Sequence, residues 1–284
     1  MVILTNPDAV NSPSTAQKQV VLWIGANAGG IGKTTLAIDI AYKMACYGAD
    51  VAILDLDTGS SMSVFCGLDK AQESSDTMAG VLSEEFEGAW PLTTPSWGTP
   101  KGKVQICKGG LFVSQIDREL GTRSRREYIL ADRLQDFALP HRLVILDCPA
   151  SLGTLTDLAL AVCTHFLIPV NLTHKSVSGA EDLLIWFRES CRRLRLNPLP
   201  TLLGIVPTQY KSTEAAQRNI MGELPERLAE AQIRCYPATR YTPEIRNASG
   251  FGLPLQVYRP GNPACQDVKE IIKDLCSLLN IKAR

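Results

Sequence analysis

The chain has 284 residues, which is enough for one large α/β domain with a sizeable core. Its 29 basic and 29 acidic side chains cancel, so nucleic-acid binding would need a local patch, because the protein as a whole is not basic. The sequence shows no apolar run of membrane-spanning length and no secretory leader, so we expect a cytoplasmic protein whose nine cysteines are reduced.

The first part of the chain predicts a strand, a helix and a second strand. Residues 1–18 are rich in Pro, Ser, Thr and Asn, and we expect a loose extension before a single domain at 19–284. The apolar run 20–26 is typical of a strand buried on both faces. A helical pattern at 33–48 ends at a glycine, and the run 51–55 predicts the next strand.

The rest of the chain continues the alternation of short apolar runs and helical patterns. The predicted strands are 104–106, 111–114, 143–146, 166–170 and 202–206. The predicted helices are 123–137, 152–162, 177–193, 213–231 and 263–279. This alternation predicts an α/β fold, with a mostly parallel twisted sheet flanked by helices on both faces.

A glycine-rich loop at residues 27–35 joins the first strand to the first helix. Glycines allow backbone N–H groups to surround phosphate oxygens, and the helix N-terminus favours an anion. In such a loop Lys33 reaches the β- and γ-phosphates, and the Thr34 hydroxyl can ligate Mg²⁺. The alternative is a glycine-rich turn without a ligand. The predicted nucleotide-binding residues are Ala28, Gly29, Gly30, Ile31, Gly32, Lys33, Thr34 and Thr35.

Carboxylates follow two of the predicted strands. Asp55 and Asp57 come at the end of the run 51–55, and Asp147 follows 143–146. Ligands of open α/β sheets bind at the carboxyl ends of strands, where a carboxylate can hold Mg²⁺ or orient an attacking water. A lone aspartate there often only caps the next helix, but this set after a phosphate loop is hard to explain as caps.

These motifs together resemble the ParA/MinD family of deviant-Walker P-loop ATPases over residues 19–275. The matching segments are GGIGKTT (29–35), LDLDTGSSMS (54–63), VILDCPASLG (144–153), FLIPV (166–170) and SGFGLPL (249–255). The resemblance implies ATP and Mg²⁺ as cofactors. It makes Lys33 and Asp57 catalytic, with Asp57 orienting the attacking water. The metal-site residues would be Thr34, Asp57 and Asp147, with Asp147 supporting Mg²⁺ through water.

The resemblance also implies a biological role. A ParA-like protein would hydrolyse ATP slowly and form an ATP-dependent homodimer that binds DNA without sequence preference on the nucleoid. With a ParB-like adaptor it would partition or position a plasmid or chromosome. Two alternatives remain: a nucleotide-gated scaffold with negligible hydrolysis, and a MinD-like membrane-associated regulator. A membrane partner is not favoured, because the C-terminal pattern resembles a packing helix rather than an added basic tail.

One departure from the family pattern concerns its signature lysine, whose position is held by Ala28. A missing signature lysine resembles the McdA branch, whose members distribute carboxysomes with a McdB-like adaptor. A lysine from the C-terminal half would then substitute, and the candidates are Lys211 and Lys175. The alternative for Lys211 is a DNA-contacting or solvated surface residue. Candidate DNA-binding residues are Arg218, Arg240 and Arg246, for which scattered surface charge is an equal alternative.

Overall fold

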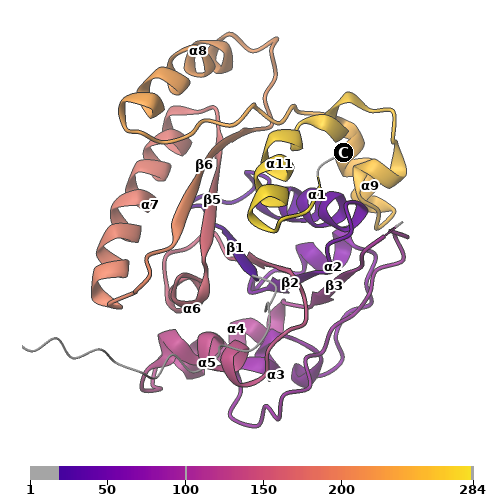
Figure 1. Ribbon diagram of the computed structural model, residues 1–284, viewed down its shortest axis with the longest axis vertical. Coiled ribbons are helices and arrows are strands. Elements are labelled where there is room, and N and C mark those ends of the chain that lie inside the picture. Colours follow the sequence, from indigo (N-terminus) through magenta and orange to yellow (C-terminus); the bar gives the residue numbers. More distant parts are fainter. Residues whose placement is uncertain (1–18, 100, 283–284) are drawn as a thin grey trace, which may run out of the picture.

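A parallel six-stranded sheet, in the order β3-β2-β4-β1-β5-β6, organises the chain (Figure 1). The computed structural model describes residues 19–99 and 101–282, so the predicted extension at 1–18 lies outside the described residues. The strands are β1 (Val20–Ile24), β2 (Val51–Asp55), β3 (Val104–Cys107), β4 (Leu143–Asp147), β5 (His165–Asn171) and β6 (Thr201–Thr208). Because every pair is parallel, the carboxyl ends of all six strands meet at one edge of the sheet.

Helices cover both faces of this sheet, which confirms the predicted α/β class. They are α1 (Lys33–Cys46), α2 (Ser61–Phe65), α3 (Met78–Leu82), α4 (Leu111–Leu120), α5 (Ile129–Asp136), α6 (Thr154–Val162), α7 (His174–Arg193), α8 (Ala215–Glu230), α9 (Pro243–Gly250), α10 (Leu255–Tyr258) and α11 (Lys269–Leu278). Short 3₁₀ turns occur at Ser74–Asp76, Arg126–Tyr128 and Pro263–Gln266. Within the described residues, no helix is both long and apolar enough to cross a membrane.

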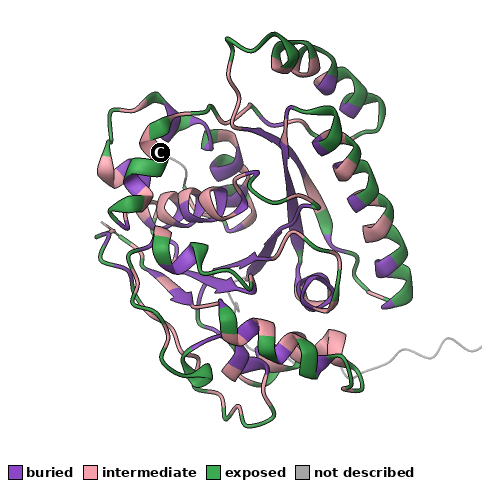
Figure 2. Cartoon of the chain, turned by 180° about the vertical axis from the view of Figure 1, so that it is seen from behind, coloured by how far each residue is buried: buried purple, intermediate pink, exposed green. Residues whose placement is uncertain are grey.

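The alternation of side chains along β1 shows why the strands are apolar throughout. Leu22 and Ile24 pack with α1 and α11 on one face, whereas Val21 and Trp23 face the core covered by α3 to α8. Figure 2 shows the sheet as a continuous buried layer between exposed helix surfaces. A strand buried on both faces needs apolar residues at consecutive positions. The polar residues that follow each strand therefore lie at the edge of the core.

Three predicted elements differ from the structure. Residues 111–114 begin helix α4 instead of a strand, because Val113, Ile116 and Leu120 are buried at helical spacing. The helix predicted over 123–137 starts only at α5, since Arg125 has a left-handed φ of 55° that interrupts it. The final predicted helix, 263–279, is a 3₁₀ turn followed by α11.

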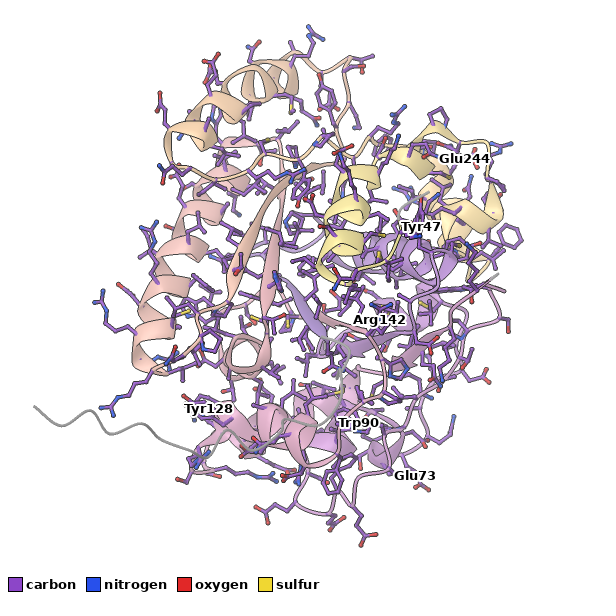
Figure 3. The ribbon with its side chains drawn as sticks, in the orientation of Figure 1. Tyr47, Glu73, Trp90, Tyr128, Arg142 and Glu244 are labelled. Atoms are coloured by element: carbon purple, nitrogen blue, oxygen red, sulfur yellow. The ribbon has the colours of Figure 1, made fainter. Side chains whose placement is uncertain are left out.

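The irregular segment between α3 and β3 is fixed by aromatic contacts. Trp90, labelled in Figure 3, donates from its indole nitrogen to the Phe137 carbonyl over 2.8 Å and packs edge-on against Phe86. Trp97 is buried on the other sheet face and donates to the Gly252 carbonyl over 2.9 Å. These contacts hold the segment against both faces of the sheet.

Candidate functional site

The loop that joins β1 to α1 has the conformation of an anion-binding turn. Gly30 and Gly32 have φ angles of 71° and 90°, a left-handed conformation that glycine adopts without strain. Gly32 is the residue before α1, so the unpaired N–H groups of the first helical turn face the loop. The Lys33 ammonium lies 3.5 Å from the Ala28 carbonyl oxygen, and the residue is only 7% exposed. Backbone N–H donors and one buried cation therefore converge at the loop between β1 and α1.

The end of β6 supports this loop from the side. The Thr208 hydroxyl donates to the Ile31 carbonyl over 2.7 Å, and the Gln209 amide donates to the Gly30 carbonyl, also over 2.7 Å. Gln209 has a left-handed φ of 56°, which turns the chain at the end of the strand. Neither residue was predicted from the sequence, although both are polar and follow the apolar run 202–206 after a single proline, at the carboxyl edge of the sheet.

Two of the predicted carboxylates lie side by side on adjacent strands. Asp55 and Asp147 are register partners at the ends of β2 and β4, and each is 1% exposed or less. The Thr34 hydroxyl donates to Asp147 Oδ2 over 2.7 Å, which joins the carboxylate to the start of α1. The other oxygen, Oδ1, is buried without a hydrogen-bond partner in the described part of the chain. Asp147 therefore presents a free acceptor beside the loop.

Asp57 differs from Asp55 in how it is held. Asp55 accepts hydrogen bonds from the N–H groups of Asp57 and Gly109 over 3.0 and 3.1 Å, so both its oxygens are occupied. Gly109 is needed there, because a Cβ atom would lie 2.6 Å from the Asp55 carboxyl carbon. Asp57 lies two residues beyond β2, is only partly buried, and accepts from the Gly59 N–H over 3.0 Å. Asp55 is thus a fixed element of the site, whereas the Asp57 carboxylate can contact a ligand.

Electrostatics at this edge favour a cation. Burial raises the pKa of the Asp147 carboxyl to about 6, although the Thr34 hydrogen bond and the Lys33 charge oppose the shift. Burial, and next the neighbouring Asp147, raise the pKa of Asp55 well above its ordinary value. Mg²⁺ prefers hard oxygen ligands. This edge offers two adjacent buried carboxylates, one of them with a free oxygen, and a hydroxyl oxygen. The residues therefore fit Mg²⁺, with Thr34 and Asp147 placed to hold it directly or through water.

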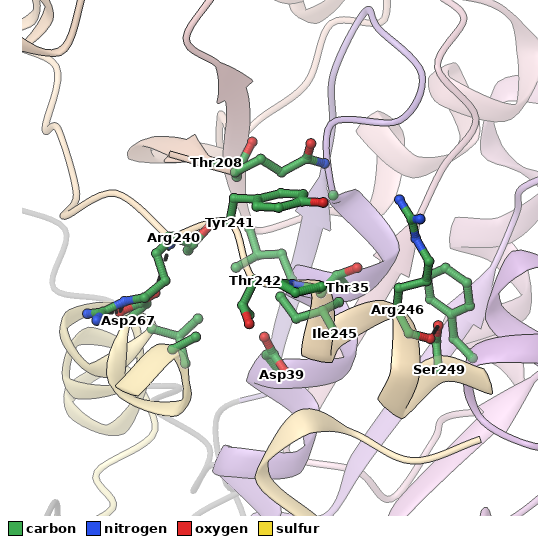
Figure 4. A pocket seen from close by; sticks show the side chains of 18 of the residues that line it. Thr35, Asp39, Thr208, Arg240, Tyr241, Thr242, Ile245, Arg246, Ser249 and Asp267 are labelled. Carbon is green, nitrogen blue, oxygen red and sulfur yellow. Dashed lines mark hydrogen bonds and ion pairs between the residues drawn. The ribbon is translucent and has the colours of Figure 1, made fainter. Parts of the chain in front are cut away.

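A cavity of about 350 Å³ opens beside the phosphate loop (Figure 4). Gly30, Gly32 and Thr35 line it on the loop side, and the segment 239–246 lines the opposite wall. Its size is typical of a small-molecule pocket. Because the loop forms one wall, a nucleotide bound through its phosphates would extend its ribose and base into this space. The sequence analysis did not predict this cavity.

Asp39, on the α1 wall of the cavity, has an unusual acidity. Burial raises the pKa of its carboxyl from 3.8 to about 7, partly opposed by a hydrogen bond from Gln256 and the charge of Lys43, whereas Asp267 adds to the shift. The folded state therefore holds a proton that the unfolded chain releases near pH 4. The stability that this proton contributes is complete below about pH 4 and is lost as pH rises through about 7.

This linkage gives a prediction for Asp39→Asn, which cannot ionise. We expect its free energy of unfolding to exceed that of the wild type by an amount that grows between about pH 5 and pH 8, reaching up to about 3 kcal/mol. Urea unfolding of both proteins at the two pH values measures the difference. An equal difference at both values would show that the carboxyl does not titrate in this range.

The candidate substitute lysines lie in different surroundings. Lys211 follows β6, and its ammonium is 2.8 Å from Glu214 Oε1 and 4.5 Å from the centre of the Tyr241 ring. Hydrogen bonding to Glu214, followed by the charge of that residue, raises the pKa of Lys211, which therefore stays protonated. Lys175 is exposed at the start of α7, after β5. Both lysines are at the carboxyl edge of the sheet, and their roles stay predictions.

The three arginines considered for DNA binding are exposed but not equivalent. Arg240 forms a two-point ion pair with Asp267, with distances of 2.7 and 3.0 Å. Arg218, on α8, donates to the Ser212 carbonyl over 2.9 Å. Arg246, on α9, lines the rim of the cavity. Asp267 largely neutralises Arg240, so Arg218 and Arg246 have the charges more available to a polyanion.

Comparison with known proteins supports the same class of site. A glycine-rich loop between a central strand and a helix, with a buried lysine and strand-end carboxylates, defines a P-loop nucleotide-binding protein. A family model described as an AAA domain matches residues 19–197. The chromosome partitioning protein ParA of Caulobacter vibrioides is 26% identical over 246 residues, which cover 84% of this chain and 86% of the relative. ParA of Myxococcus xanthus is 24% identical, covering 90% and 87% respectively.

Solved structures show the same fold. A McdA variant from Cyanothece in complex with ATP superposes with a TM-score of 0.77 at 19% identity, covering 94% of this chain and 99% of that one. MinD from Pyrococcus horikoshii in complex with Mg-ADP gives a TM-score of 0.71 at 17% identity, with the same coverages of 94% and 99%. The chain belongs to the AAA-domain family that its residues 19–197 match, as a P-loop ATPase of the ParA/MinD group.

Proposed function

We propose that this protein is an ATP-dependent dimerising ATPase that binds DNA without sequence preference and positions or partitions large cargo on the nucleoid. The relatives named as chromosome partitioning proteins align over most of both chains, which supports the positioning role. The observation that carries the proposal is the convergence of Lys33, the Thr34–Asp147 pair and Asp57 at one edge of the sheet. A ParB-like or McdB-like adaptor would link the ATPase to its cargo.

Each side chain at this edge has a separate task in the proposed reaction. Lys33 and the backbone N–H groups of the loop bind and neutralise the β- and γ-phosphates. Thr34 and Asp147 would hold Mg²⁺, which would neutralise charge that develops on the phosphate oxygens. Asp57 accepts a hydrogen bond from the attacking water and orients it in line with the γ-phosphate. Asp55 positions the Asp57 segment through the hydrogen bond from the Asp57 N–H.

One observation favours a second candidate, a nucleotide-gated scaffold with negligible hydrolysis. Ala28 occupies the position of the family's signature lysine, so the cross-subunit cation is absent from the phosphate loop itself. Two triphosphates that face each other in a dimer repel one another unless a cation lies between them. A measurement of ATP turnover distinguishes the two candidate functions, because a scaffold would bind ATP without releasing phosphate.

We propose that Lys211 supplies the missing cation and predict that Lys211→Ala prevents ATP-driven dimerisation. Its segment contacts the phosphate loop through Gln209, so it lies on the side of the nucleotide. The ammonium would exchange Glu214 for a partner's phosphate, an ionic contact that gains strength when desolvated. Light scattering with a non-hydrolysable ATP analogue and no DNA should show wild-type dimers and variant monomers.

Lys175→Ala is the matched control for Lys211→Ala, because it removes the same charge from the next strand end at the same edge. It should dimerise like the wild type. A Lys211→Ala variant that still dimerises and only loses DNA affinity would assign Lys211 to the DNA surface. Loss of dimers in Lys175→Ala alone would transfer the role to that residue.

Binding to DNA should depend on ATP and weaken steeply with salt. The zero net charge leaves only local patches, and dimerisation doubles each of them. We expect Arg218→Ala and Arg246→Ala to weaken binding equally on unrelated sequences, and Arg240→Ala to weaken it less, because Asp267 already pairs with that charge. Filter binding across a salt series on two unrelated duplexes measures this. A strong preference for one duplex would contradict sequence-independent binding.

A further inference from the structure

The α1 wall of the cavity beside the phosphate loop carries a carboxylate with no assigned role. Asp39 lies on α1, one helical turn beyond Thr35, and both residues line the cavity. Figure 4 shows the Asp39 carboxylate directed into the cavity, opposite the segment that carries Tyr241 and Thr242. A helical turn advances about 5.4 Å along α1, so Asp39 lies farther from the loop than a phosphate would bind.

The contacts of Asp39 leave one of its oxygens available. Gln256, on α10, donates to Asp39 Oδ1 over 2.9 Å, and it is the hydrogen-bond donor to this carboxyl in the described part of the chain. The second acid of the cavity, Asp267, is already paired with Arg240. Asp39 is therefore the carboxyl that faces the cavity without an ion-pair partner among the described residues.

Asp39 is partly buried, with a hydrogen bond to only one of its oxygens, and burial raises the pKa of its carboxyl to about 7. A purely structural role does not require a carboxyl at this position, because many side chains that cannot ionise would fit the same place on α1. Above about pH 7, where the carboxyl is ionised, its free oxygen can accept a hydrogen bond from a ligand donor. The cavity begins at Gly30 and Gly32, so a nucleotide held at the loop would extend its ribose and base toward Asp39.

We propose that Asp39 determines base specificity, with its free oxygen accepting a hydrogen bond from the exocyclic amino group of adenine. This inference rests on the proposed function, in which ATP is the ligand of the phosphate loop. The Tyr241 ring lines the same cavity and offers a flat apolar surface against which a base can stack. Lys211 lies over that ring at 4.5 Å, which links the base-binding wall to the proposed dimer contact.

The test compares ATP with purine riboside 5′-triphosphate, which differs from ATP only in lacking the 6-amino group. Titration calorimetry with Mg²⁺ present should show the wild type binding ATP roughly 10- to 100-fold more tightly than the analogue, as expected for a hydrogen bond to an ionisable group. Asp39→Ala should bind ATP as weakly as wild type binds the analogue, with its own affinity for the analogue unchanged. Asp39→Asn should lose most of the preference as well, because its single amide oxygen accepts from Gln256 and an NH2 group, which cannot accept, then faces the base.

Each other outcome contradicts a specific part of the inference. An unchanged ATP preference in Asp39→Ala, or equal affinity of the wild type for both triphosphates, would overturn the role of Asp39 while ATP binding at the loop stands. The comparison of ATP with the analogue on the wild type needs no variant, so the inference stays testable if Asp39→Ala does not fold. Failure of the wild type to bind either triphosphate would overturn the proposed function together with this inference. Asp69→Ala, on an exposed surface, is the control and should retain the full preference.

Discussion

Replacing Lys33 by alanine should weaken ATP binding by two to four orders of magnitude. Lys33 is a buried cation at the phosphate loop, and the triphosphate would be its charge partner. Removing one member of a buried charge pair costs about 3–5 kcal/mol, which sets the size of the effect. The loop conformation depends on Gly30, Gly32 and the support from β6 rather than on Lys33, so the variant should stay folded.

Calorimetric titration with Mg-ATP measures this loss directly. Lys70→Ala is the control, because it removes the same charge from an exposed position and should leave ATP affinity unchanged. Equal ATP affinity in the Lys33→Ala variant and the wild type would mean that the loop does not bind the triphosphate. The whole assignment of the site would then be wrong.

Replacing Asp57 by alanine should separate ATP binding from ATP hydrolysis. The Asp57 carboxylate is partly buried and held by the Gly59 N–H, and its proposed task is to orient the attacking water. Loss of a positioned base or water-orienting group typically costs about 10²- to 10⁴-fold in rate. The variant should bind ATP nearly as well as the wild type, and should therefore accumulate as an ATP-bound dimer.

Single-turnover phosphate release and light scattering together test this expectation. Asp55 provides the contrast, since both of its oxygens accept backbone N–H groups, and Asp55→Ala should destabilise the fold as well as the site. Unchanged turnover in the Asp57→Ala variant would remove Asp57 from the reaction. If turnover is unchanged in Asp57→Ala but lost in a folded Asp55→Ala variant that still binds ATP, the role moves to Asp55.

The sheet is the part of the structure that is most predictable from the sequence. Each strand is short, apolar at consecutive positions and bounded by polar residues or glycine, as expected of a strand covered on both faces. The segment 111–114 is an exception to this rule, because four residues with three apolar side chains fit a strand or the first turn of a helix equally well. The helical spacing of the apolar residues Val113, Ile116 and Leu120, which are the buried positions of α4, was the better indication of a helix.

The phosphate loop and the strand-end carboxylates are predictable for a different reason. Their positions follow from parallel topology alone, since every strand delivers its next residues to the same edge. The different roles of Asp55 and Asp57 do not follow, because they depend on the N–H group of Gly109, which is distant in sequence. The helix α9 was missed although Thr242 and Pro243 carry ordinary capping and first-turn signals.

The cavity beside the loop lies beyond the reach of sequence patterns. Its walls come from α1, the segment 239–246 and Asp267, which are distant in sequence and meet only in the fold, through contacts such as the Arg240–Asp267 ion pair. A lone aspartate in an amphipathic helix, such as Asp39, carries no motif that would mark it. Its importance appears only when burial, the single hydrogen bond from Gln256 and the neighbouring phosphate loop are seen together.

Phosphate release from ATP shows whether this site hydrolyses its nucleotide. The measurement uses the full chain with Mg²⁺ and non-specific duplex DNA, run in parallel with the Lys33→Ala and Asp57→Ala variants under single-turnover conditions. We expect slow phosphate release by the wild type that is clearly faster than in either variant. Wild-type release no faster than in the Lys33→Ala variant, although the wild type binds ATP, would contradict the ATPase assignment and leave a nucleotide-gated scaffold.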